Sequence, residues 1–125
     1  MGNLFADGTE PGFLDWAVLA RAFGLRDVAY YCCNSVPAAI RQEHERDWLR
    51  CYAEILAESG ITLDLDAAWD GYRLFALYSW LAATSTAAMG SLWQPLHVGL
   101  GGTERATAAL EELGCIDRLR ERLGV

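Results

Sequence analysis

Lysine is absent from this chain of 125 residues, and all ten basic residues are arginine. Its absence excludes phosphate-binding motifs built on a lysine, the Walker A loop among them. Acidic residues number 17, so the net charge is −7. An acidic chain repels nucleic acid and anionic membranes, and we expect neither of them as a partner.

Paired metal-binding cysteines are also missing. The four cysteines, Cys32, Cys33, Cys51 and Cys115, form no C-x-x-C pair, which argues against a zinc or redox motif. We expect free thiols. No secretory signal peptide opens the chain, and the apolar run over residues 74–89 is shorter than the roughly 20 residues of a membrane span. These features together predict a cytoplasmic protein.

The first sixteen residues read as a β-hairpin. Two short apolar runs, residues 3–6 and 12–15, flank a turn-forming cluster at 7–11. A five-residue loop would place Ala6 opposite Gly12, Leu4 opposite Leu14 and Asn3 opposite Asp15. Opposed residues have Cβ atoms roughly 5 Å apart. The amide and the carboxylate would then form an oxygen pair able to hold Mg²⁺.

Helical periodicity fills the rest of the chain after an irregular connector over residues 16–24. A short helix over 27–34 comes first. Ser35 is expected to cap a second helix that ends at Gly60. Its buried stripe is predicted from apolar spacing to comprise Ile40, His44, Trp48, Cys51, Tyr52, Ile55 and Ser59.

A third helix should begin at Asp64 or Asp66 and end near Met89, as the most apolar and therefore central helix. Residues 91–102 read as a loop, Thr103 as the cap of a fourth helix, and residues 116–123 as a last short helix. The predicted fold class is therefore mainly α, with a short N-terminal hairpin followed by about five helices. The inward stripe of the third helix is predicted to be Trp69, Tyr72, Phe75 and Ala76.

The N-terminal motifs resemble a known family. The runs Gly2-Asn3-Leu4-Phe5 and Gly12-Phe13-Leu14-Asp15-Trp16 precede Gly24-Leu25-Arg26-Asp27-Val28-Ala29-Tyr30, in that order. This arrangement is similar to the aminoglycoside phosphotransferase and choline-kinase-like superfamily, most of all its ecdysteroid-kinase-like branch. The resemblance covers about the first sixty residues. It implies the C-terminal lobe of a protein-kinase-like fold and an ATP-dependent phosphotransferase acting on a hydroxyl group.

The resemblance assigns roles residue by residue. Asn3 and Asp15 match the two Mg²⁺ ligands, and Asp27 matches a buried carboxylate that braces the catalytic loop. The catalytic Asp of the family would precede Met1, and the lobe that carries its ATP-binding lysine is absent. We therefore expect one partial domain over residues 1–125, with a metal-site hairpin at 1–16 and a helical subdomain at 17–125, inactive alone. Mg²⁺ and ATP would belong to the complete enzyme.

The partners follow from the same resemblance. A missing N-terminal lobe, a partner chain or self-association should cover the apolar surface left exposed. The acceptor would be a small molecule with a hydroxyl group, bound against the helices, and some of the aromatic residues could line its pocket. Asp47 and Asp70 are candidates for binding a cationic acceptor, on the basis of charge alone.

Other interpretations compete with the kinase. The chain could be a non-catalytic helical module for binding or oligomerisation, or the ligand-binding domain of a transcriptional regulator, although it lacks a basic DNA-reading helix. His44 is expected to be a packed side chain, and His97 has no partner at ligand spacing. Residues 99–103 resemble a phosphate-binding turn, but no strand precedes them, so a flexible loop is the expectation.

Overall fold

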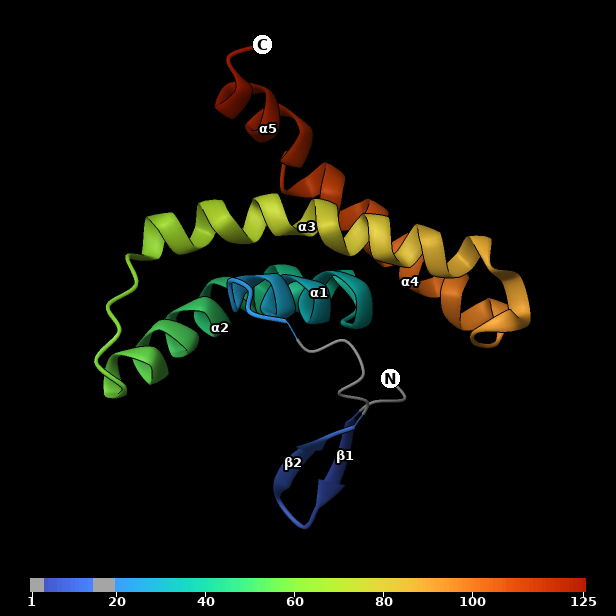
Figure 1. The fold of residues 1–125 in the computed structure, drawn as a ribbon, viewed down its shortest axis with the longest axis horizontal. Helices are drawn as coiled ribbons and strands as arrows, with labels where there is room; N and C mark the ends of the chain where they lie inside the picture. The colour runs from blue at the N-terminus through green and yellow to red at the C-terminus, as the bar shows by residue number, and fades with distance from the viewer. Residues whose placement is uncertain (1–3, 15–19) are drawn as a thin grey trace.

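The computed structural model describes residues 4–14 and 20–125 (Figure 1). It begins with a two-stranded antiparallel hairpin and continues with five α-helices, which confirms the predicted fold class. The elements are β1 (Leu4–Asp7), β2 (Glu10–Phe13), α1 (Leu25–Ser35), α2 (Ala38–Glu58), α3 (Leu65–Ala88), the short 3₁₀ helix η1 (Gly90–Leu92), α4 (Leu96–Glu112) and α5 (Cys115–Leu123).

The hairpin has a tighter turn than the sequence predicted. Leu4 lies opposite Phe13 and Asp7 lies opposite Glu10, so the turn contains two residues rather than five. Gly8 has a φ of 64°, the positive value that a two-residue hairpin turn requires at its first position. The predicted pairing of Leu4 with Leu14 is therefore wrong by one residue, and such a slip moves side chains to the other face of a strand.

The central position predicted for α3 is confirmed. In Figure 1, α3 runs the width of the helical body, with α1 and α2 below it, α4 along its later half and α5 above its middle. Asp64 caps the helix, since its carboxylate accepts a hydrogen bond from the Ala67 N–H at 2.8 Å. Tyr72 and Ala76 of the predicted stripe are fully buried, and Trp69 and Phe75 are partly buried.

The predicted buried face of α2 is only partly confirmed, because Trp48 and Tyr52 are partly buried against the core while other members of the stripe are exposed. The helix buries Arg41, Glu45, Leu49 and Ala53, whereas Ile40 of the predicted stripe is 47% exposed. The error arises because a buried arginine can pair with a buried glutamate, a possibility that apolar spacing ignores. The predicted N-cap of α2, Ser35, is also wrong. Ser35 is the last residue of α1, and α2 begins after Pro37.

The N-cap of α4 is Pro95, eight residues before the predicted Thr103. The helix begins at Leu96 and includes the glycines that suggested a loop. A Cβ atom on Gly99 would lie 3.3 Å from the Ala87 backbone, and one on Gly102 would lie 2.4 Å from Asn34 Oδ1. These glycines therefore allow α4 to approach α3 and α1 closely, and the loop and the phosphate-binding turn are both ruled out for residues 99–103.

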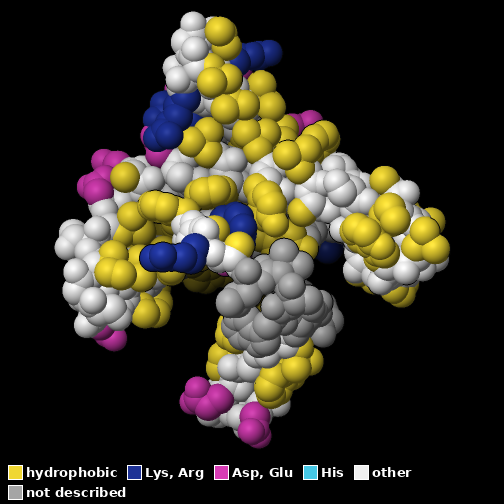
Figure 2. Space-filling model, viewed as in Figure 1, with side chains coloured by type: hydrophobic (Ala, Val, Ile, Leu, Met, Phe, Trp, Pro, Cys, Tyr) yellow, Lys and Arg dark blue, Asp and Glu magenta, His cyan; other side chains and the backbone are white. Residues whose placement is uncertain are grey.

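Large apolar side chains remain on the surface. Figure 2 shows them over the helices and on the hairpin. Several lie where η1 joins α4, including Leu92 at 80% and Trp93 at 65% exposed. Within residues 4–14 and 20–125, no helix combines the length and the apolar character needed to cross a membrane.

Candidate functional site

The two predicted Mg²⁺ ligands, Asn3 and Asp15, lie outside the described residues. The hairpin register that was expected to place them opposite each other is not the register observed. In the part of the chain that the structure describes, no group of three or more His, Cys, Asp or Glu residues could hold a metal ion. No described cluster therefore takes the place of the predicted pair.

Asp27, predicted to be a buried bracing residue, lies on the surface of this chain. It occupies the first turn of α1, and its side chain is 74% exposed. Its carboxylate accepts a hydrogen bond from Arg26 Nε at 3.2 Å. The burial implied by the family resemblance is therefore not observed among the described residues.

The candidate acceptor-binding carboxylates, Asp47 and Asp70, each have an arginine partner. Asp47 accepts a hydrogen bond from Arg50 at 2.6 Å on the exposed face of α2. Asp70 is bonded to Arg118 of α5, and this hydrogen bond lowers the pKa of the Asp70 carboxyl. Neither carboxylate lines the cleft described next.

A cleft of about 570 Å³ lies between the end of α1, the end of α3 and the start of α4. Tyr30, Tyr31 and Asn34 of α1 form one side. Trp93, between η1 and α4, lies on the other side, as the prediction of an aromatic-lined pocket allows. Leu4, the first residue of β1, also lines the cleft, so the hairpin reaches it.

Small residues build the base of the cleft. Ala83 of α3 and both Gly99 and Gly102 of α4 line it, and the glycines allow the backbones to approach. Thr103, predicted as a helix cap, lies inside α4 instead. Its hydroxyl lies within hydrogen-bonding distance of the Ala83 carbonyl at 3.2 Å and the Gly99 carbonyl at 3.0 Å, which ties α4 to α3.

Arg105 is the one charged side chain among the described residues that line the cleft. Its Nε donates a hydrogen bond to the Asn34 carbonyl at 2.8 Å, which fixes the guanidinium between α4 and α1. No ion pair joins it to a carboxylate within residues 4–14 and 20–125, while Arg41, Arg50 and Arg118 each have one. The cleft therefore combines aromatic walls with a positive charge.

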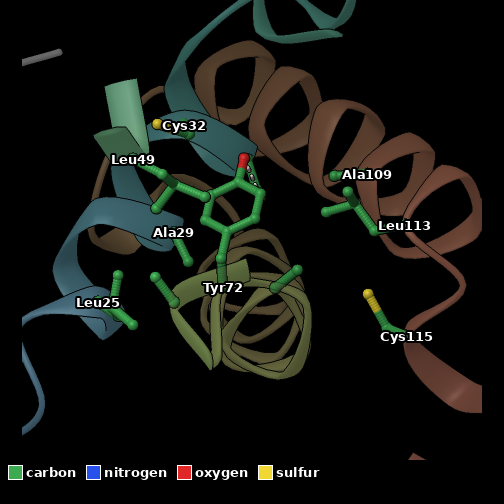
Figure 3. Packing of buried hydrophobic residues seen from close by; sticks show 11 residues of the cluster. Leu25, Ala29, Cys32, Leu49, Tyr72, Ala109, Leu113 and Cys115 are labelled. Atoms are coloured by element: carbon green, nitrogen blue, oxygen red, sulfur yellow. Dashed lines mark hydrogen bonds between the residues drawn. The ribbon is translucent and has the colours of Figure 1, made fainter. Parts of the chain in front are cut away.

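A second polar group surrounds the hydroxyl of Tyr72, whose ring lies in the hydrophobic core (Figure 3), and none of its members lines the cleft. The Tyr72 hydroxyl donates a hydrogen bond to Glu45 Oε2 at 3.0 Å and accepts one from Cys33 Sγ at 3.6 Å. Arg41 Nη1 donates to the same Glu45 oxygen at 2.5 Å, and Arg41 Nη2 is bonded to Glu112. Arg41 and Tyr72 are at most 1% exposed, so this network stabilises the fold rather than meeting a ligand.

The cysteines are free thiols, as predicted. Burial raises the pKa of Cys32 to about 12 and of Cys33 and Cys115 to about 11. Such thiols stay protonated at neutral pH and are poor nucleophiles. Cys51 is exposed on α2.

Neither histidine is part of the cleft. The His44 ring lies 5.7 Å from the Trp48 ring, between centroids, which agrees with the predicted packing. Its side chain is nevertheless 44% exposed. His97 is exposed in the first turn of α4.

No protein-family model, curated protein or solved structure matches the chain. The cleft was missed at the sequence level because its lining comes from α1, α3 and α4, which are far apart in the sequence. One signal was present: Gly99 and Gly102 are three residues apart, the spacing that places small residues on one face of a helix.

Proposed function

We propose that this chain is the C-terminal, helical part of an ATP-dependent kinase that phosphorylates a hydroxyl group on a small molecule. The acceptor oxygen would attack the γ-phosphorus of ATP while the bond from this phosphorus to the ADP oxygen breaks. The hydroxyl proton would pass to a carboxylate base, leaving a phosphate ester and ADP. The ordered motifs from Gly2 to Tyr30 support this proposal, because they match the metal-site hairpin and the following helix of the resembled family.

The observation that carries the proposal is the position of Leu4 in the wall of the cleft. Leu4 directly follows Asn3, the predicted metal ligand, in the sequence. A kinase must hold its acceptor hydroxyl close to the metal-bound phosphate, since catalysis depends on positioning the two reactants. A cleft that reaches the first residue of the hairpin is suited to hold that acceptor.

In this proposal Asn3 and Asp15 hold Mg²⁺, which would offset the charge of the ATP phosphates. This assignment rests on the family resemblance and not on the hairpin register, which differs from the predicted one. Asp27, which is exposed in this chain, would pack against the catalytic loop that leads to Asn3 in the resembled family. The 125 residues contain neither the catalytic Asp of that loop nor any lysine to bind phosphate. We therefore expect the chain alone to be inactive, because phosphoryl transfer needs these parts together.

The coding sequence upstream of Met1 provides the first test. We expect an in-frame His-Gly-Asp motif that places an Asp five residues before Asn3, preceded by a lobe with a lysine. The protein containing that sequence should consume ATP in the presence of an alcohol acceptor and Mg²⁺, and Asp15→Ala should abolish turnover. Asp7→Ala at the tip of the hairpin is the matched control and should retain it. Turnover that survives Asp15→Ala would overturn the proposal.

A second candidate, a non-catalytic helical module for binding or oligomerisation, is favoured by the exposed apolar side chains at the η1–α4 junction. Leu92, Trp93 and Leu100 are 80%, 65% and 54% exposed. Apolar surface of this kind marks contact sites. Light scattering should show self-association that Leu92→Glu reduces and Leu123→Glu, on α5, does not. A monodisperse wild-type monomer would argue against this module and against a missing lobe.

A further inference from the structure

The cleft has an uneven distribution of charge. Arg105 supplies a positive charge, and none of the described residues that line the cleft is acidic. The other polar groups in the lining, such as Asn34, Thr86 and Gln94, are neutral. The two carboxylates expected to attract a cationic acceptor, Asp47 and Asp70, lie elsewhere and are paired with Arg50 and Arg118.

We propose that this cleft binds a small molecule that joins a carboxylate or phosphate group to a flat, apolar body, with Arg105 holding the anionic group. The inference rests on the proposed function in one respect only, namely that the bound molecule is the acceptor of the kinase. Binding itself requires only the cleft. An anionic acceptor replaces the cationic one that Asp47 and Asp70 suggested.

The geometry around Arg105 favours an oxyanion. The hydrogen bond from Nε to the Asn34 carbonyl holds the guanidinium in place and uses one of its donors. No hydrogen bond joins Nη1 or Nη2 to another described residue, so both nitrogens remain for a ligand. A guanidinium with two parallel donors matches a carboxylate or phosphate in shape and in charge.

The walls and the size of the cleft select the rest of the ligand. Tyr30, Tyr31 and Trp93 offer aromatic surface, on which a flat ring can pack. A volume of about 570 Å³ is within the range of clefts that enclose small organic molecules. The ligand is therefore larger than a free inorganic anion, and its apolar part contributes to binding alongside the charge.

Three probes that share a 4-hydroxyphenyl ring and carry a negative, neutral or positive group test the inference: 4-hydroxyphenylacetate, its neutral amide and the cationic amine tyramine. Each is titrated into the chain while tryptophan fluorescence and heat are measured. We expect the carboxylate to bind at least about tenfold more tightly than the amide, and tyramine to bind most weakly. Equal affinities, tighter binding of tyramine, or no binding of any probe at millimolar concentration would overturn the inference.

Two variants assign the charge preference to the cleft. Arg105→Gln should remove the preference for the carboxylate, and Arg50→Gln, on the exposed face of α2, is the matched control that should keep it. Gln94→Glu leaves Arg105 and its bond to Asn34 in place while adding a negative charge, so it should weaken carboxylate binding about tenfold even if Arg105→Gln fails to fold. A preference for the carboxylate that persists in Gln94→Glu would contradict the assignment.

The outcome separates this inference from the kinase proposal. Carboxylate binding that depends on Arg105, together with no catalytic motif upstream of Met1, would support the anion site and reject the kinase. Phosphorylation of amino alcohols in preference to hydroxy acids by the complete enzyme would support the kinase and reject the anion site.

Discussion

The two halves of α3 are packed in different ways. The first half places Tyr72 among Leu25, Leu49 and Cys33, and the enclosed network of Arg41 and Glu45 fills the space beside it. The second half meets α4 through Trp80, which donates a hydrogen bond to Thr107, and, near its end, through small residues, with the Ala87 backbone close to Gly99. Large side chains close the first region, whereas small ones bring the backbones of the second together and leave the cleft at its edge.

The comparison shows how one helix can serve two purposes. Where three helices meet through large and polar side chains, every buried polar group needs a partner, and the region becomes a rigid core. Where helices meet through alanine and glycine, the backbones approach closely but the side chains cannot fill the space between the helices. Substitutions in the first half should therefore change stability, and substitutions in the second half should change the cleft.

The largest effect is expected from Arg41→Ala. It leaves the Glu45 carboxylate buried without its cation, which should lower the free energy of unfolding by about 3–5 kcal/mol. Urea unfolding followed by circular dichroism measures the change. Arg50→Ala removes an exposed pair and should cost less than about 1 kcal/mol. Equal losses in the two variants would remove the energetic distinction between core and surface pairs.

Alkaline pH should weaken the same half of α3. Burial raises the pKa of Cys33 from 9.0 to about 11, so the unfolded chain ionises this thiol first. The stability gained from the neutral thiol is complete below pH 9 and is lost as the pH rises through about 11. Over this range Cys33→Ala should reduce the pH dependence of the unfolding free energy by up to about 1.4 kcal/mol per pH unit. A pH dependence in Cys33→Ala equal to that of the wild type would contradict this prediction.

In α4, two neighbouring glycines should respond differently to substitution. Gly102→Val places a side chain against Asn34, whose Oδ1 would lie 2.4 Å from the new Cβ, and should destabilise the fold by about 2 kcal/mol. Gly101→Ala meets only the flexible end of Arg105, and should be neutral or up to about 1 kcal/mol stabilising. Thermal unfolding of both variants measures the difference, and equal effects would refute the close contact at Gly102.

The smallest effect is expected from Tyr72→Phe. The ring stays in the core, but Glu45 loses a hydrogen bond and Cys33 loses its acceptor. The expected cost is about 1 kcal/mol. Tyr30→Phe is the matched control, because Tyr30 is 39% exposed on α1 and its hydroxyl is not part of this network. A wild-type stability for Tyr72→Phe would mean that the network contributes no net stability.

The sequence predicted the helices best where local signals were strong. Asp64 caps α3, and Gly60, with a positive φ, follows the end of α2, both as expected. Two errors have the same physical origin, namely contacts between distant segments. Arg41 and Glu45 pair inside the core, and the glycines of α4 contact other helices rather than forming a loop.

The candidate site was harder to predict than the helices, for one local reason and one that depends on distant contacts. The hairpin register was misjudged because the turn at Gly8 is tighter than its polar sequence suggested. Arg105 had no local feature to distinguish it from the other arginines. Its position follows from its bond to the Asn34 backbone, 71 residues away in the sequence, which only the folded chain brings near.

The burial of three thiols has a practical consequence for labelling the protein. Cys51 is the one exposed cysteine, and the absence of lysine removes the usual competing side-chain amines. A maleimide dye or spin probe should therefore attach at a single side chain on α2 without engineering. That position lies outside the cleft lining, so the probe can report on ligand binding and on association while leaving the cleft free.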